Sequence, residues 1–168
     1  MRRRKEKMTT ALEQAKLLVP ALRTLAQAAV EPLTAQYPPL AALMTQVPPE
    51  RWQFFFITTG IGVSLLLAPV QVAAADQDQV CDAVGAALAA WHPQGHDALE
   101  DFLKFVKDNL AKEMELPAAV GVWLLWNLKQ AQPEGEELRL AWPLGLFFLH
   151  SLKDWWDTDT AAEEPGVS

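Results

Sequence analysis

Two histidines four positions apart, His92 and His96, have the spacing in this sequence that comes nearest to a metal site. Glu100 follows them, and imidazole together with carboxylate is a ligand set that zinc or iron accepts. Pro93 and Gly95 lie between the histidines, so the sequence predicts a loop, which does not place both rings on one helix face. His92, His96 and Glu100 are therefore weak metal-ligand candidates. A polar connection between helices is the favoured interpretation, and we expect no metal or cofactor.

No arrangement typical of catalysis is visible in the chain. The single cysteine, Cys81, lies close to Asp78 and Asp82, and negative neighbours raise a thiol pKa, which argues against a nucleophile. His150 stands in an apolar segment, where a lone histidine is more often a hydrogen-bonded core residue than a base. The chain also lacks a phosphate-binding loop, a dinucleotide fingerprint and a Cys-x-x-Cys pair, so we expect a protein without enzymatic activity.

Tryptophan is frequent in this chain, which has seven tryptophans and one tyrosine. Trp123 and Trp126 are three residues apart and share a helix face, so we expect both to pack in a core. Trp155 and Trp156 are adjacent, and adjacent helical positions do not face one core, so at least one should be exposed. Because tryptophan is enriched in interaction hot spots, all four are candidate interaction residues, with Trp155 and Trp156 forming the expected contact surface.

The elements that position these side chains are predicted to be helices. Alanine and leucine dominate the composition and β-branched residues do not alternate for long, which favours an all-α fold. The 168 residues fit one helical domain, residues 9–156, between a basic flexible N-terminus, 1–8, and an acidic disordered tail, 157–168. We expect an irregular bundle of about six or seven helices around a long apolar central helix.

Prolines indicate where the helices begin, because a first helical turn tolerates their missing N–H group. The Pro-Pro pairs at 38–39 and 48–49 predict breaks, while Pro20 predicts a kink. The expected helices cover 9–30, two short pieces before the two Pro-Pro pairs, and then 50–75, 76–90, 97–114, 117–132 and 136–156.

A short internal repeat also stands out. The segment 120–129 matches 144–153 without a gap, and Gly62, Gly85, Gly121 and Gly145 follow one another at intervals of 23, 36 and 24 residues. This spacing suits two related helical hairpins separated by a shift of about 60 residues. Chance similarity between apolar helices rich in alanine, leucine and glycine explains the same match. The hairpins should superpose if the duplication is real.

Residues 52–75 are an uncharged run of 24 residues, which is long enough to cross a membrane. The basic N-terminal side fits an orientation with the N-terminus inside. Thr58, Thr59, Ser64 and Pro69 make the run less apolar, so a buried core helix is the favoured interpretation. Membrane association through 52–75 is the alternative.

The net charge of −7 is unevenly distributed. Up to Arg23, seven Lys and Arg against two Glu give +5, and in the remainder seven against nineteen acidic residues give −12. The acidic body argues against nucleic-acid binding. The basic N-terminus and the acidic stretch 154–164 predict salt-sensitive head-to-tail pairing between subunits. One cysteine and no apparent secretory signal favour the cytoplasm, with a membrane location as the alternative.

These observations favour a non-enzymatic interaction protein, such as an adaptor, assembly factor or oligomeric scaffold, that binds a protein partner or itself. A membrane-associated protein anchored by 52–75 is the first alternative. A helical binder of an apolar small molecule is the second, with a pocket lined by Phe54, Phe55, Phe56, Trp123 and Trp126.

Overall fold

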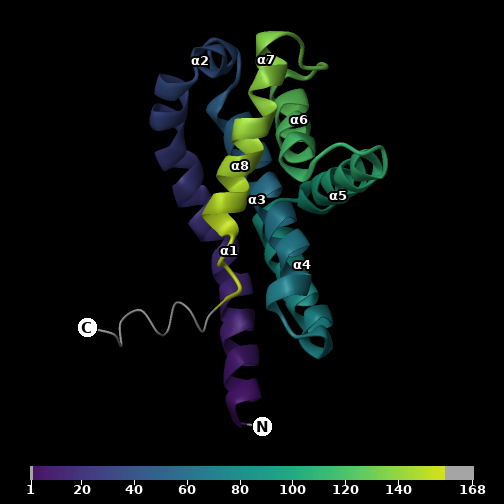
Figure 1. Cartoon of the computed structure of the whole chain (residues 1–168). Coiled ribbons are helices and arrows are strands. Elements are labelled where there is room, and N and C mark those ends of the chain that lie inside the picture. The colour runs from purple at the N-terminus through teal and green to yellow at the C-terminus, as the bar shows by residue number, and fades with distance from the viewer. Residues whose placement is uncertain (1, 158–168) are drawn as a thin grey trace, which may run out of the picture.

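A computed structural model describes the backbone of residues 2–157 and the side chains of residues 10–157. Within this range the chain forms helices and connections without any strand, which confirms the all-α fold (Figure 1). Seven of these helices have at least seven residues, and α7 is a single turn. The elements are α1 (Arg2–Gln36), α2 (Pro38–Met44), α3 (Pro49–Gln71), the 3-10 turn η1 (Ala74–Asp76), α4 (Gln77–Trp91), α5 (Gly95–Ala111), α6 (Leu116–Lys129), α7 (Glu136–Arg139) and α8 (Ala141–Leu152).

Helix α1 is longer than the sequence predicts, because it does not end at Val30 but continues through Pro32 to Gln36. Pro20 and Pro32 are both exposed, so the carbonyl groups that they leave without a helical donor are on the solvent side. The opposite side of α1 carries the buried residues at helical spacing, Ala11, Ala15, Leu18, Leu22, Ala26, Ala29 and Leu33. Neither Pro20 nor Pro32 therefore ends the helix.

The two Pro-Pro pairs do begin new helices, as predicted. α2 starts at Pro38 after Tyr37, whose backbone is extended, and α3 starts at Pro49 after the extended Pro48. Proline fixes its own φ near the helical value and moves the preceding residue away from helical geometry. Both pairs thus start a helix, and the first pair also limits α1, which ends at Gln36.

Helix α3 lies at the centre of the bundle, as expected for the long apolar segment. It contacts α1, α4, α5, α6 and α8, and all nine residues from Phe56 to Ser64 are buried (Figure 1). The hydroxyl groups of Thr58, Thr59 and Ser64 donate to carbonyl groups of α3 itself, at 2.8, 2.6 and 2.7 Å. These polar side chains are therefore compatible with a helix that is buried on every side.

Helix α3 ends at Gln71 rather than at Ala75, and Val72 is extended. The side-chain amide of Gln77 donates to the carbonyl groups of Val72 at 3.0 Å and Pro69 at 3.4 Å. The next helix thus satisfies carbonyl groups at the end of α3, which allows the chain to turn four residues early.

Helices α6 and α8 contain the two matching segments and pack closely against each other. A Cβ atom added to Gly121 would overlap the backbone of Ala141, and one added to Gly145 would overlap the backbone of Pro117. Along α6 the contacts run from Pro117 to Gly121, while their partners on α8 run backwards from Gly145 to Ala141, so the two helices are antiparallel. Only glycine allows the two backbones to approach this closely.

The other two glycines of the pattern, Gly62 and Gly85, do not contact each other's helices in this way. Gly62 of α3 lies against the ring of Phe102, and Gly85 of α4 faces His96 with ordinary spacing, 3.6 Å from an added Cβ. Both neighbours belong to α5. The α3–α4 pair therefore lacks the mutual glycine contact that α6 and α8 make.

The end of the described chain turns back onto the bundle. α8 ends at Leu152 instead of continuing to Trp156, and residues 153–156 form turns. Gln14 of α1 donates to the carbonyl of Trp155 at 2.7 Å, and Gln71 of α3 accepts from the backbone N–H of Trp156 at 3.1 Å. Two helices thus hold this segment in place. The predicted acidic tail beyond Asp157 lies outside the described residues, as do the side chains of the predicted basic N-terminus.

Candidate interaction site

The adjacent tryptophans at the C-terminal end face the interior, contrary to the predicted contact surface. Trp156 is 3% exposed, and its indole N–H donates to the carbonyl of Ser64 at 2.7 Å. Trp155 is half-buried, and its indole nitrogen has no hydrogen-bond partner among the described residues. The rule for adjacent helical positions does not apply, because the two residues lie in turns after α8.

Trp123 and Trp126 have different environments although they are three residues apart on α6. Trp123 is 2% exposed and packs edge-on against Phe102 of α5 and Phe55 of α3, with ring centroids at 5.1 and 5.7 Å. Trp126 is 41% exposed, and its one described ring neighbour is Phe105 at 6.3 Å. The expected core position is confirmed for Trp123 and wrong for Trp126, because α5 covers the first turn and leaves the second open.

Trp126 lies at a surface pocket of about 310 Å³ between α5 and α6. We call it the Trp126 pocket, and its lining residues are Asp101, Phe105, Trp123, Trp126 and Asn127. α5 supplies Asp101 and Phe105 at positions i and i+4, and α6 supplies the other three from two successive turns. Two helices that pack side by side thus bring together residues 18 to 26 positions apart in the chain.

The polar atoms at the Trp126 pocket are arranged so that oxygen atoms remain available. Asp101 Oδ2 accepts the indole N–H of Trp123 at 2.9 Å, and Asp101 Oδ1 makes no hydrogen bond with a described residue. Asn127 donates one Nδ2–H to the carbonyl of Trp123 at 2.8 Å, and its Oδ1 makes no hydrogen bond with a described residue. Among the described side chains, no lysine or arginine lines this pocket. It therefore offers two acceptor oxygens beside aromatic rings.

The sequence pattern does not single out Asp101, Phe105 and Asn127 as binding residues. Each belongs to an i, i+4 pair on its own helix, Asp101 with Phe105 and Trp123 with Asn127. That signal shows which residues share a face, but it does not show that the two faces meet.

The weak metal candidates do not converge. His92 is half-buried, accepts the backbone N–H of Gln94 on Nδ1 at 3.0 Å, and packs on Phe54 with ring centroids 4.6 Å apart. His96 and Glu100 are exposed on α5. Among residues 10–157, no group of three or more His, Cys, Asp or Glu side chains is placed to hold a metal ion.

The predicted apolar ligand pocket is occupied by the side chains that were expected to line it. Phe56 is fully buried and packs on Phe148 with ring centroids at 4.6 Å, and Phe55 packs on Trp123. Phe54 lies instead against Trp91 at 5.3 Å. Aromatic packing fills this part of the core, and Trp126 lies at the surface away from it.

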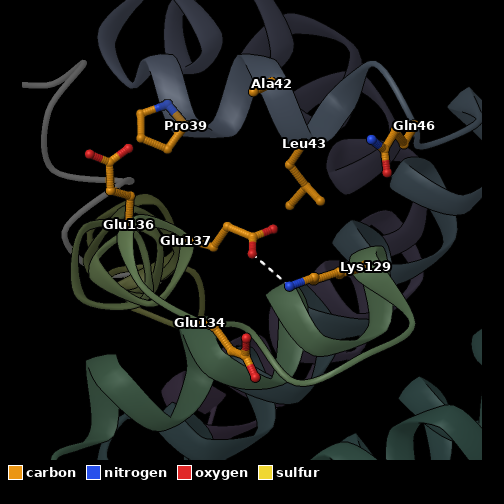
Figure 2. Close-up of a pocket in the computed structure, with 8 residues that line it drawn as sticks. All are labelled: Pro39, Ala42, Leu43, Gln46, Lys129, Glu134, Glu136 and Glu137. Atoms are coloured by element: carbon orange, nitrogen blue, oxygen red, sulfur yellow. Dashed lines mark hydrogen bonds and ion pairs between the residues drawn. The ribbon is translucent and has the colours of Figure 1, made fainter.

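A second pocket, of about 420 Å³, lies between α2 and the segment that leads from α6 into α7 (Figure 2). We call it the acidic pocket, because Glu134, Glu136 and Glu137 line it together with Lys129. Lys129 Nζ is paired with Glu137 at 2.7 Å, as the dashed line in Figure 2 shows. Unlike the described lining of the Trp126 pocket, it contains a cationic side chain, the Lys129 ammonium.

The two remaining chemical candidates lie at the surface. Cys81 is exposed, and partial desolvation together with the charges of Asp78 and Asp82 raises the pKa of its thiol, as the sequence predicts. His150 is exposed on α8, so the expected core position is wrong. Neither residue lines the Trp126 pocket.

No protein-family model, no curated protein and no solved structure matches the chain.

Proposed function

We propose that this protein is a non-enzymatic helical interaction protein that binds through the Trp126 pocket. The observation that supports this proposal is the exposure of Trp126 at a surface pocket. The Trp123–Asp101 hydrogen bond fixes two of the other residues that line this pocket. Tryptophan is the residue most enriched in binding hot spots, and a hot spot sits in a preformed pocket more often than on a flat surface. The proposed compartment is the cytoplasm.

A matched pair of variants tests this proposal, because Trp142 of α8 is 43% exposed and Trp126 is 41% exposed. Trp126→Ala should reduce the recovery of specific partners by at least about tenfold in quantitative affinity purification after cross-linking in cells. Trp142→Ala should retain them. Far-UV circular dichroism of both variants checks that the fold is kept. Equal recovery by two folded variants would contradict the proposal.

Membrane association is the second candidate function, and one observation favours it. α3 is the helix in the described chain that is long and apolar enough to cross a membrane. Insertion of α3 alone requires that it leave α1, α5, α6 and α8, whose apolar faces would then need another cover. More than half of its most apolar window, 56%, is buried in the bundle. This cost makes the interaction protein our first proposal.

Membrane fractionation with a high-pH carbonate wash separates the two functions. We expect the protein in the supernatant without detergent, because the apolar surface of α3 is covered by its own chain. Retention in the pellet would show that α3 is inserted and that the bundle opens in the membrane.

A further inference from the structure

We infer that the Trp126 pocket binds a cationic side chain, and that its occupant is the basic N-terminal segment, residues 2–7, of a second copy of this chain. This inference rests on the proposed function and specifies the chemistry of its partner. The result is a head-to-tail contact between subunits.

A cation fits the Trp126 pocket for two reasons. Two of its oxygen atoms, Asp101 Oδ1 and Asn127 Oδ1, make no hydrogen bond with a described residue, and guanidinium and ammonium groups are pure donors that such acceptors bind. The exposed indole of Trp126 and the ring of Phe105 add π faces that attract a cation. The helix behind them is acidic, because α5 has four acidic residues, two lysines and therefore a net charge of −2, with histidine neutral.

The densest basic run of this chain is in residues 2–7, where Arg2, Arg3, Arg4, Lys5 and Lys7 are accompanied by one glutamate. The part of the chain after Arg23 has a net charge of −12 and attracts such a segment over a longer range. Charge complementarity therefore favours another copy of this chain as the partner.

A molecule cannot place its own N-terminal segment in its own pocket. α1 is one helix from Arg2 to Gln36, and in Figure 1 its first turns extend beyond the other helices and away from α5 and α6. The contact is therefore between molecules. Since the segment and the pocket are different surfaces, the contact is heterologous and forms a ring or an open chain of subunits.

Two other acidic surfaces of the chain compete for the same basic segment. One is the stretch 154–164, which the sequence analysis paired with the N-terminus. The other is the acidic pocket of Figure 2, where Glu134 and Glu136 accompany the paired Lys129. The Lys129 ammonium already pairs with Glu137 and repels a second cation, which makes the acidic pocket a poorer match, and both surfaces serve as alternatives in the test.

Sedimentation velocity of the full-length chain at several concentrations is the first measurement. We expect the mean mass to rise with concentration at low salt and the association to disappear at about 0.5 M salt. Replacing Arg2, Arg3 and Arg4 with Gln should abolish it. Asp101→Asn and Trp126→Ala should each weaken it, by roughly fivefold or more in the dissociation constant.

Two full-length variants act as matched controls. Glu136→Gln removes the same single charge from the acidic pocket, and neutralising Asp159, Glu163 and Glu164 removes charge from the tail. We expect association to persist in both. Loss of association in either control, with no effect of Asp101→Asn, would overturn the assignment to the Trp126 pocket.

A synthetic peptide of residues 1–12, added to the full-length chain, measures the contact directly. The peptide should compete with self-association and bind about fivefold more weakly to Asp101→Asn. A chain that stays monomeric and does not bind the peptide overturns this inference. If Trp126→Ala nevertheless loses partners that Trp142→Ala keeps, the proposed function still stands. If those two variants also behave alike, both proposals fail.

Discussion

At the scale of single residues, the indole N–H groups show which tryptophans are integrated into the core. Trp52 donates to the carbonyl of Ala26 at 2.9 Å, Trp123 to Asp101 at 2.9 Å, and Trp156 to the carbonyl of Ser64 at 2.7 Å. Each of these bonds joins two helices or a helix and the C-terminal segment. A buried indole needs such an acceptor, so these contacts define the position of the ring as well as its burial.

Trp155 and Trp156 permit a comparison between a paired and an unpaired indole. Trp156→Phe should lower the free energy of unfolding by about 1–2 kcal/mol, because it removes a buried hydrogen bond and some packing. Trp155→Phe should cost less, because its buried indole nitrogen has no partner among the described residues. Urea denaturation of both variants measures the difference. A larger loss for Trp155→Phe would contradict the assignment.

The Cys81 thiol should react slowly. Its pKa is raised by partial desolvation and by Asp78 and Asp82, so at about pH 8 a smaller fraction is thiolate than in a free thiol. Alkylation by iodoacetamide should be slower than that of N-acetylcysteine and should speed up as the pH rises. Replacing Asp78 and Asp82 with Asn should increase the rate. An unchanged rate in this double variant would show that the carboxylates do not influence the thiol.

At the scale of elements, α6 and α8 form a pair with local two-fold character. Gly121 contacts residue 141, and Gly145 contacts residue 117. Each glycine therefore packs against the partner helix one turn before that helix's own glycine. The positions Pro117 and Ala141 correspond in the repeat, as do Gly121 and Gly145. The repeat in the sequence therefore corresponds to a symmetric close contact, which needs small residues at the crossing.

This contact predicts opposite effects for alanine at different glycines. Gly121→Ala and Gly145→Ala should each destabilise the fold by about 1–3 kcal/mol or more, since the added Cβ meets rigid backbone. Gly85→Ala is the control, because its Cβ meets only ordinary contact with His96 at 3.6 Å. It should stabilise α4 by up to about 1 kcal/mol. Thermal denaturation measures all three, and similar effects at Gly121 and Gly85 would contradict the packing described.

At the scale of the whole molecule, α3 connects most of the bundle. It contacts α1, α4, α5, α6 and α8, and its centre is covered on every side. Separate folding of two halves would expose the apolar residues of α3, so the described chain should unfold as one unit.

This connectivity predicts a single unfolding transition in urea. Tryptophan fluorescence reports on several contacts, among them those of Trp52 with α1, of Trp123 with α5 and of Trp156 with α3, while far-UV circular dichroism reports on all helices. The two signals should change together, with the same midpoint. Separate midpoints would show that part of the bundle unfolds independently of α3.

The sequence by itself determined the features that depend on local chemistry. Composition predicted helices, and the pairs Pro38-Pro39 and Pro49 after Pro48 predicted two helix starts, because proline restricts its own backbone and that of its neighbour. The uncharged run predicted the central helix, since a segment apolar on all sides needs cover on all sides. Helix ends were less accurate. An exposed Pro32 loses one hydrogen bond to solvent and need not end a helix.

Only the tertiary structure decided which faces of the helices are covered. Trp123 and Trp126 are equivalent in the sequence pattern, but α5 buries the first and leaves the second beside Asp101. Trp156 lies in the core because the chain turns after α8, which allows its indole N–H to donate to the carbonyl of Ser64, 92 positions earlier. Burial depends on contacts between residues far apart in the chain, whereas periodicity reports only on neighbours along one helix.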